Sequence, residues 1–355
     1  MGAFLEAEKT AQQRFKVISS SFSEAARASG VFMERPRPFC VPIERSPENL
    51  FPEIRRSAMS FFHDHHIKWH DELDGNPSNH MCDSQICCVN FLFPFADKPE
   101  ALAALLQPFF PSLSRVLEIE DQYITFEWIG LENYLKERIP RNGQRTRGAH
   151  FTSADAAVLF EHDDGRHQIV LIEWKYTESY DGTHLLFSAK GTDRRAIYRW
   201  LYEDPCCPLD QSLIPSFDDL FYEPFYQLMR QQFLAWRMEL ARELGADIVS
   251  VLHVAPLANG DFRAVTSPAL RSLGVSPTVI WPRLLRQPDR FFSVATEDLF
   301  RRLPVNRFPE LSRWWSYVSE RYRWLCRNSF DLLGNTDGER RSSHFDRGRI
   351  ENEDQ

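Results

Sequence analysis

The chain has 355 residues, of which 43% are hydrophobic, and a formal net charge of −8. This length allows one large domain or two modest ones, and the apolar content excludes a disordered chain. The acidic balance excludes a protein that holds nucleic acid through bulk positive charge, but it is compatible with a local basic cleft.

Composition also bears on the cellular compartment. No apolar run approaches the ~18 residues of a membrane span, so we expect no membrane association. Residues 1–9 lack the basic and apolar regions of a secretory signal. Seven cysteines, four of them in two adjacent pairs, favour reduced thiols over a disulfide framework. Together these features predict a cytoplasmic protein.

The N-terminal part, residues 1–115, is predicted to be a mostly helical elaboration that packs on a central core. Residues 6–16 and 54–71 have helical patterns. A further helix is expected at 79–91, and a short one at 101–106.

Histidines and cysteines crowd into the segment 63–88, which raises the question of a zinc site. The segment has no CxxC pair, two of its cysteines are adjacent, and two of its histidines are four residues apart without the Glu of an HExxH motif. The spacing therefore disfavours a structural zinc. The side chains concerned are His63, His65, His66, His70, His80, Cys82, Cys87 and Cys88.

Residues 123–129 alternate aromatic or β-branched residues with polar ones, which predicts a strand. The loop that follows, 138–154, is basic and contains no acidic residue. A positive loop is suited to holding a nucleic-acid backbone, and the alternative is an ordinary solvated loop. Its basic residues are Arg138, Arg141, Arg145 and Arg147.

The most informative stretch is a predicted hairpin. Residues 155–161 have a strand pattern, and residues 168–175 return as a second strand whose consecutive apolar residues indicate burial on both faces. The polar turn 162–167 joins them and contains Gly165, which can take positive φ.

The hairpin brings two carboxylates together. Asp155 opens the first strand, and Glu173, 18 positions later (173 − 155), lies near the end of the second. Residues i and i+2 of a strand share a face, so Glu173 and Lys175 project together. Carboxylates are hard oxygen ligands suited to Mg²⁺, and a nearby Lys can orient a metal-bound water or stabilise charge on phosphorus.

Asp155 and the Glu173-x-Lys175 triplet, on two apolar strands, resemble the PD-(D/E)XK nuclease superfamily. The strings RGAHFTSAD (147–155) and LIEWKYTESY (171–180) are similar to those of uncharacterised bacterial proteins grouped with the restriction endonucleases. Ala154 stands where the name of the motif has Pro, which is a departure from the pattern.

The resemblance implies a mixed α/β, restriction-endonuclease-like fold, in which helices flank a central β-sheet and residues 116–265 form the core. It implies that Asp155 and Glu173 are ligands of Mg²⁺, for which Mn²⁺ would substitute, and that Lys175 is the catalytic lysine. The alternative is a surface Asp and an edge-strand Glu/Lys pair that carry no chemistry.

The resemblance also implies supporting residues. Members of the superfamily add an acidic residue from an earlier element; Glu127 and Glu132 are the candidates, and we prefer Glu132 because it is expected at the end of an element. Ser84-Gln85 also resembles the family. The polar candidates are Ser153, Gln85, Gln227 and Gln231.

After the hairpin comes a long insertion, residues 176–219, and then a helix at 225–244 that Gly245 is expected to end. A strand at 247–254 completes a β-β-β-α-β order. Basic residues here and in the arginine loop are candidates for nucleic-acid binding, namely Arg141, Arg145, Arg147, Lys190, Arg194 and Arg230.

The C-terminal part, residues 266–334, is predicted to be helical and rich in arginine and aromatic residues. Between positions 281 and 330 it has ten arginines and five acids. Helical spacing favours a core position for the aromatic stripe, with the arginines facing solvent or DNA. Residues 335–355 are charged and poor in apolar residues, which predicts a disordered tail.

These features predict a metal-dependent endonuclease that hydrolyses phosphodiester bonds of DNA. A bacterial source and a restriction or anti-phage role follow from the resemblance alone. The alternative is an inactive nuclease-fold module that binds nucleic acid or protein. The sequence does not decide between DNA and RNA, and a homodimer would suit the cleavage of two strands.

Overall fold

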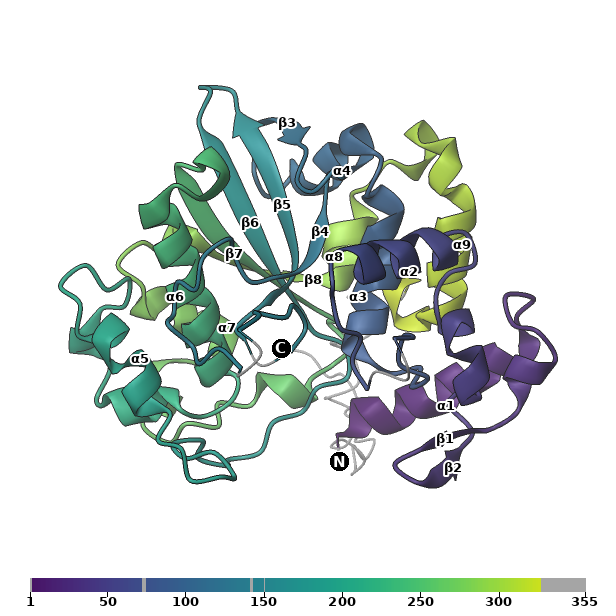
Figure 1. Ribbon diagram of the computed structural model, residues 1–355, viewed down its shortest axis with the longest axis horizontal. Helices are drawn as coiled ribbons and strands as arrows, with labels where there is room; N and C mark the ends of the chain where they lie inside the picture. Colours follow the sequence, from purple (N-terminus) through teal and green to yellow (C-terminus); the bar gives the residue numbers. More distant parts are fainter. Residues whose placement is uncertain (1, 72–74, 141–142, 150, 327–355) are drawn as a thin grey trace, which may run out of the picture.

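The structure is a computed structural model that describes residues 2–71, 75–140, 143–149 and 151–326 (Figure 1). The predicted tail at 335–355 and the candidate Arg141 lie outside the described residues. None of the described helices is long and apolar enough to span a membrane.

The predicted hairpin forms the middle of a mixed six-stranded sheet, which confirms the expected fold class. Strand β5 (Ala154–His162) pairs antiparallel with β6 (His167–Trp174), and the turn between them contains Gly165 with φ 81°. Strand β7 (Ile248–Ala255) runs parallel to β6, and β8 (Phe291–Ala295) runs parallel to β7. Two strands pair with β5 on its other side, β3 (Leu113–Leu117) and β4 (Thr125–Trp128).

Helices cover both faces of the sheet (Figure 1). One face carries α5 (Arg195–Tyr202), α6 (Phe225–Ala241) and α7 (Pro277–Ile280). The other face carries most of the N-terminal part together with the C-terminal helices. These are α1 (Ala3–Ile18), α2 (Arg55–Asp64), α3 (Ser84–Leu92), α4 (Pro99–Leu106), α8 (Thr296–Arg301) and α9 (Ser312–Arg321). A small two-stranded ribbon, β1 (Gly30–Phe32) with β2 (Arg35–Arg37), stands apart from this sheet.

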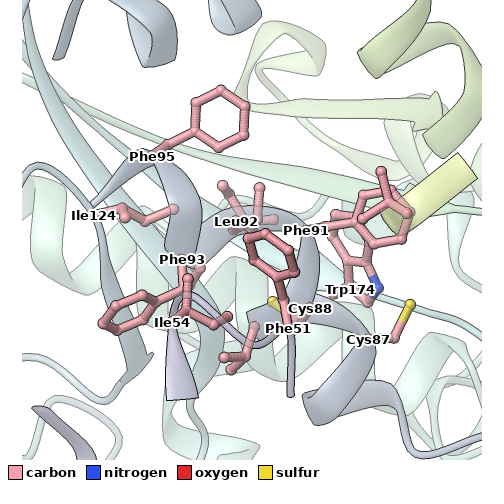
Figure 2. Packing of buried hydrophobic residues seen from close by; sticks show 14 of the residues in the cluster. Phe51, Ile54, Cys87, Cys88, Phe91, Leu92, Phe93, Phe95, Ile124 and Trp174 are labelled. Atoms are coloured by element: carbon pink, nitrogen blue, oxygen red, sulfur yellow. The ribbon is translucent and has the colours of Figure 1, made fainter. Parts of the chain in front are cut away.

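The sheet separates two hydrophobic cores, and β6 contributes alternately to both. Val170, Ile172 and Trp174 pack into the core on the side of α3, whereas Ile169 and Leu171 pack into the core on the side of α6. The unbroken apolar run of β6 is therefore explained by burial on both faces. Figure 2 shows the first core, where the Trp174 and Phe91 ring centroids are 5.2 Å apart.

Several helix ends differ from the predicted ones because single residues take left-handed backbone conformations. Helix α2 ends at Asp64 rather than continuing to residue 71, and His66 has φ 54°. Helix α6 ends before Arg242, whose φ is 53°, so the predicted stop at Gly245 was three residues late. Left-handed φ is uncommon for residues with side chains, and the sequence pattern did not indicate it.

The C-terminal aromatic stripe is buried, which confirms its predicted core position, but one arginine of the same helix is buried with it. Arg321 is fully covered and donates hydrogen bonds to Gln12 Oε1 (3.0 Å), Asn49 O (2.5 Å), Asn49 Oδ1 (2.6 Å), Tyr317 Oη (2.7 Å) and Met81 O (3.2 Å). We call these residues the Arg321 cluster. It joins α1, α9 and two loops of the N-terminal part. The buried aromatic side chains are Trp314, Tyr317, Tyr322 and Trp324.

Candidate active site

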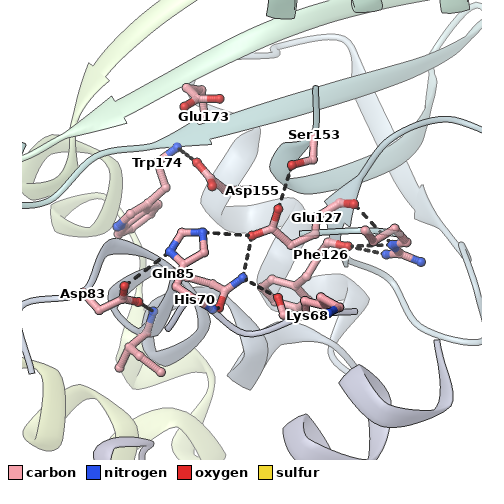
Figure 3. Close-up of polar contacts among 12 residues, drawn as sticks. Lys68, His70, Asp83, Gln85, Phe126, Glu127, Ser153, Asp155, Glu173 and Trp174 are labelled. Carbon is pink, nitrogen blue, oxygen red and sulfur yellow. Dashed lines mark hydrogen bonds and ion pairs between the residues drawn. The ribbon is translucent and has the colours of Figure 1, made fainter. Parts of the chain in front are cut away.

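The register of the hairpin places Asp155 opposite Glu173. Ala156 pairs with Ile172, so the next positions of the antiparallel pair are Asp155 and Glu173. Asp155 Oδ2 accepts a hydrogen bond from the backbone N–H of Trp174 (2.6 Å), which holds its carboxylate against the end of β6 (Figure 3). The two carboxylates thus lie at the same end of the hairpin, as the spacing predicted.

Glu173 and Lys175 project to one side of β6 and bind each other. Lys175 Nζ lies 2.6 Å from Glu173 Oε1, and the two residues are only 5% and 1% exposed. Gln231 of α6 reaches the same group, because its Nε2 donates to Glu173 Oε2 (2.6 Å) and to Ser153 O (2.5 Å). Helix α6 therefore braces the catalytic candidates from the side opposite Trp174.

Burial makes the charged forms of the ionisable groups in this cluster energetically costly. Burial raises the pKa of Asp155 to about 7, against the lowering effect of Lys175, with a further rise from Glu127. Burial likewise raises the pKa of Glu173 to about 8, although Lys175 opposes the rise. Burial lowers the pKa of Lys175, but the acidic groups around it, Glu173 first, outweigh that effect and leave the pKa above its usual range.

Glu127 is the third carboxylate of the site. It is 2% exposed; its Oε1 accepts from Gln85 Nε2 (2.7 Å) and its Oε2 accepts from Ser153 Oγ (2.7 Å) (Figure 3). Its φ of 49° is left-handed, a conformation that is uncommon for a residue with a side chain. Burial raises the pKa of this carboxyl as well, and His70 opposes the rise.

The structure places Glu127, rather than the preferred Glu132, beside the hairpin end. Glu132 is exposed and lines a different cavity, whereas Glu127 reaches the hairpin end. The preference assumed that an acidic residue at the end of an element would point to the site. In the structure the acid comes from within β4 itself, next to the strand that carries Asp155.

A cavity of about 410 Å³ opens beside these residues. Asp155 and Lys175 line it directly, while Glu173 lies beneath Lys175 and Gln231 rather than on its surface. Polar side chains from several segments of the chain line this cavity. Further ionisable or polar side chains at the cavity are His70, Ser84, Glu127, Thr152, Ser153, Glu178, Tyr180, Glu223, Gln227, Arg230 and Gln231.

Arg230 brings a positive charge to the cavity and is held by a buried network. Its Nε donates to Thr152 Oγ1 (2.9 Å), and its Nη2 lies 3.9 Å from Glu137 Oε1. Glu137 in turn accepts hydrogen bonds from Thr152 and from Tyr198 Oη (2.8 Å). Of the described residues that were predicted to bind nucleic acid, Arg230 alone lines the cavity.

Arg145 and Arg147, two other predicted nucleic-acid contacts, form hydrogen bonds within the protein. This corrects the prediction that these arginines of the loop face a nucleic-acid backbone. Arg147 is 8% exposed and binds Glu120 through Nη1 (2.7 Å) and the Phe126 carbonyl through Nε (3.1 Å). Arg145 donates to four consecutive backbone carbonyls, those of residues 129–132. Arg145 secures the turn after β4, whereas Arg147 joins β4 itself to Glu120. The basic pattern of the loop did not reveal either contact.

The remaining basic candidates are farther from the hairpin end. Lys190 is exposed, and Arg194 donates to the Leu185 carbonyl (2.9 Å) while its guanidinium lies 5.5 Å from the Tyr226 ring centroid. Neither lines the cavity. Their role in nucleic-acid binding stays a prediction.

Sequence reasoning missed three cavity residues, Glu178, Tyr180 and Glu223. Glu178 and Tyr180 follow the Glu-x-Lys triplet within the string already singled out, so their proximity to it was the available signal. Glu223 lies just before α6, one turn ahead of Gln227, whose backbone N–H donates to Glu223 Oε2 (3.3 Å).

The histidines and cysteines of 63–88 are dispersed in the structure. Cys87 and Cys88 are buried in the core of Figure 2, His63 is exposed on α2, and the His80 ring packs against Phe32 and Phe39. Within the described ranges, no three His, Cys, Asp or Glu side chains form a group that would hold a metal ion.

The donor set at the hairpin end fits Mg²⁺, which needs only one or two protein carboxylates because it keeps waters and binds phosphate oxygens. Each Glu173 oxygen, like Asp155 Oδ2, accepts one hydrogen bond and keeps a second lone pair. Burial raises the pKa of both carboxyls, and a bound cation would favour their charged forms. Gln231 Oε1 is buried beside them with no partner among the described residues.

A family model described as "Restriction Endonuclease associating with ARP" matches residues 6–323, which is nearly the whole chain. No curated protein and no solved structure matches the chain.

Proposed function

Because the chain belongs to the family of restriction endonucleases associating with ARP, we propose that it is a metal-dependent endonuclease that hydrolyses phosphodiester bonds of DNA. The observation that carries this proposal is the cluster of Asp155, Glu173 and Lys175 at one end of the hairpin, beside a polar cavity. Asp155 and Glu173 would hold Mg²⁺, which lowers the pKa of a bound water and neutralises charge on phosphorus.

Lys175 acts in this proposal as a cation rather than as a base. Its pKa lies above the usual range, so its ammonium keeps its proton at neutral pH. A protonated ammonium can orient the attacking water and stabilise the charge that develops on the phosphoryl oxygens. Gln231 keeps Glu173 in place from α6, and Arg230 offers a positive charge to the substrate phosphate.

Incubation of the purified protein with supercoiled plasmid and Mg²⁺ or Mn²⁺ tests the proposal. We expect metal-dependent nicking by the wild type, a loss of at least about 10²-fold in Lys175→Ala, and normal activity in Lys98→Ala. Lys98 is a matched control because it pairs with Asp97 and does not line the cavity. Equal activity of wild type and Lys175→Ala, or no cleavage of DNA or RNA by the wild type, would contradict it.

Binding measurements separate catalysis from substrate capture. Lys175→Ala should bind a labelled DNA duplex in EDTA about as well as the wild type, because the proposed role of Lys175 lies in the chemical step. The proposal extends to a restriction role and to an association with ARP, which the family description names. Co-purification of the tagged chain with that partner would test the association.

A further inference from the structure

His70 is a cavity residue that the proposed mechanism leaves without a role. It follows α2 in a loop, its side chain is 39% exposed, and it lines the same cavity as Asp155 and Lys175. A histidine that is accessible from a cavity can exchange a proton with a bound substrate.

Two contacts hold His70 in place, one through its ring and one through its backbone (Figure 3). Its Nδ1 lies 3.3 Å from Asp83 Oδ2, and its backbone N–H donates to Gln85 Oε1 (2.8 Å). Asp83 is itself held as the N-cap of α3, because its Oδ1 accepts from the Ile86 N–H (2.8 Å). With Nδ1 occupied by Asp83, Nε2 is the nitrogen left for another group. It forms a long ion pair with Glu127 Oε1 at 3.9 Å, which is beyond hydrogen-bond distance and leaves the Nε2–H free to donate.

The surroundings favour the protonated form of His70. Burial lowers its pKa, but the carboxylates of Asp83, Glu127 and Asp155 outweigh burial and raise it to about 9. Asp71 is a further acidic neighbour, and His70 opposes the rise that burial causes in the pKa of its carboxyl. In the metal-free protein the imidazole therefore holds a proton at neutral pH.

We propose that His70 is a catalytic general acid that donates its Nε2 proton to the leaving oxygen of the phosphodiester, with Asp83 as its positioning residue. This inference rests on the proposed nuclease function. The other two cations of the cavity are less suited to the role. The Lys175 ammonium binds Glu173, and an Arg230 guanidinium does not release protons in proteins.

The step balances as a hydrolysis. The oxygen of water forms a new bond to phosphorus while the bond from phosphorus to the bridging oxygen breaks. The bridging oxygen leaves with the proton of His70, and the proton that the attacking water loses goes to solvent. Neutral His70 regains a proton from solvent before the next cleavage, so no oxidant or co-reactant is required.

A substrate whose leaving atom needs no proton tests the role. After the cleaved bond is mapped on natural DNA, an oligonucleotide carries sulfur in place of the bridging oxygen that leaves. We expect His70→Gln to slow cleavage of natural DNA by about 10²–10³-fold but to slow the sulfur substrate less than about 3-fold, because a thiolate leaves unprotonated. Equal losses on the two substrates, or no loss on natural DNA, would overturn the inference.

Two further variants complete the experiment. His63→Gln is the matched control, because His63 is 87% exposed on α2 and lies outside the cavity, and it should cleave both substrates like the wild type. Asp83→Asn keeps an N-capping side chain but removes the carboxylate that raises the pKa of His70. It should shift the alkaline fall of the rate to lower pH, whereas a purely structural role would leave that pH profile in place. A wild type that does not cleave natural DNA would instead remove the nuclease function itself.

Discussion

Two buried polar clusters differ in the charge that they hold. The Arg321 cluster contains one cation, and the partners to which its guanidinium donates are all neutral oxygens of Gln12, Asn49, Met81 and Tyr317. The active-site cluster, which is Glu127, Asp155, Glu173, Lys175 and Gln231, contains three carboxylates and one ammonium, which binds Glu173. The first borders packed side chains, and the second borders a cavity.

The contrast shows how a folded chain can use buried polarity in two ways. When every donor has an acceptor and no like charges meet, the cluster stabilises one arrangement of the surrounding segments. When like charges are crowded beside a cavity, the cluster is costly on its own and favours a bound cation. The two clusters should therefore respond to substitution in opposite ways.

The largest expected effect is the loss of cleavage in Asp155→Asn. The amide keeps the shape of the side chain but loses the charge that would hold Mg²⁺, so the cleavage rate should fall by about 10³-fold, which is about 4 kcal/mol. Metal-dependent plasmid nicking measures the rate. Wild-type activity in this variant would show that the active-site cluster does not depend on the charge of Asp155.

Arg321→Lys should mainly affect stability. An ammonium has three donors where the guanidinium has five, so some of the acceptors in the Arg321 cluster lose their partners. We expect the free energy of unfolding to fall by about 2–3 kcal/mol, as measured by urea denaturation, while the activity per folded molecule stays unchanged. An unchanged free energy of unfolding would show that the hydrogen bonds of the guanidinium are not needed to stabilise this cluster.

Asp155→Asn should also change the pH dependence of stability. The folded pKa of Asp155, about 7, lies above the unfolded value, so the wild type loses stability as the pH rises through about 7. Asn does not titrate, and without metal the variant should therefore gain on the order of 2 kcal/mol over the wild type between pH 5 and pH 8. Thermal unfolding in EDTA at both pH values measures this gain, and a constant difference would contradict the raised pKa.

The smallest expected effect lies outside both clusters. Lys190 is exposed, so Lys190→Ala should weaken DNA binding by no more than about 1 kcal/mol and reduce the salt dependence by about one phosphate contact. Binding titrations at several salt concentrations measure this dependence. An unchanged salt slope would remove Lys190 from the nucleic-acid interface.

The sequence predicted the hairpin well because local pattern determines it. The apolar run of β6 and the glycine of the turn specify two paired strands, and pairing carries Asp155 to Glu173 without further information. The contact from α6 to Glu173 could also be predicted, since Gln231 lies on a helix with clear periodicity. These features depend on residues that are close in sequence or on one recognisable element.

What the sequence could not reveal depends on single backbone angles and on distant partners. Glu127 lies at the site and has a left-handed φ inside a predicted strand. Arg147 is not available to bind nucleic acid, because Glu120 and the Phe126 carbonyl bind its guanidinium. His70 appeared only as a candidate zinc ligand, since its link to Asp83 requires two loops to meet. Arg321 seemed to belong to an exposed helix face.

The Arg321 cluster also has a consequence for the order in which the chain folds. Arg321 binds Asn49 across 272 positions of sequence, and the neighbouring Tyr322 ring lies 4.9 Å from that of Phe91, which packs against Trp174 beside Glu173. Contacts of such long sequence separation form late in folding. The packing behind the strand that carries Glu173 is therefore completed only after the chain has been synthesised through Tyr322.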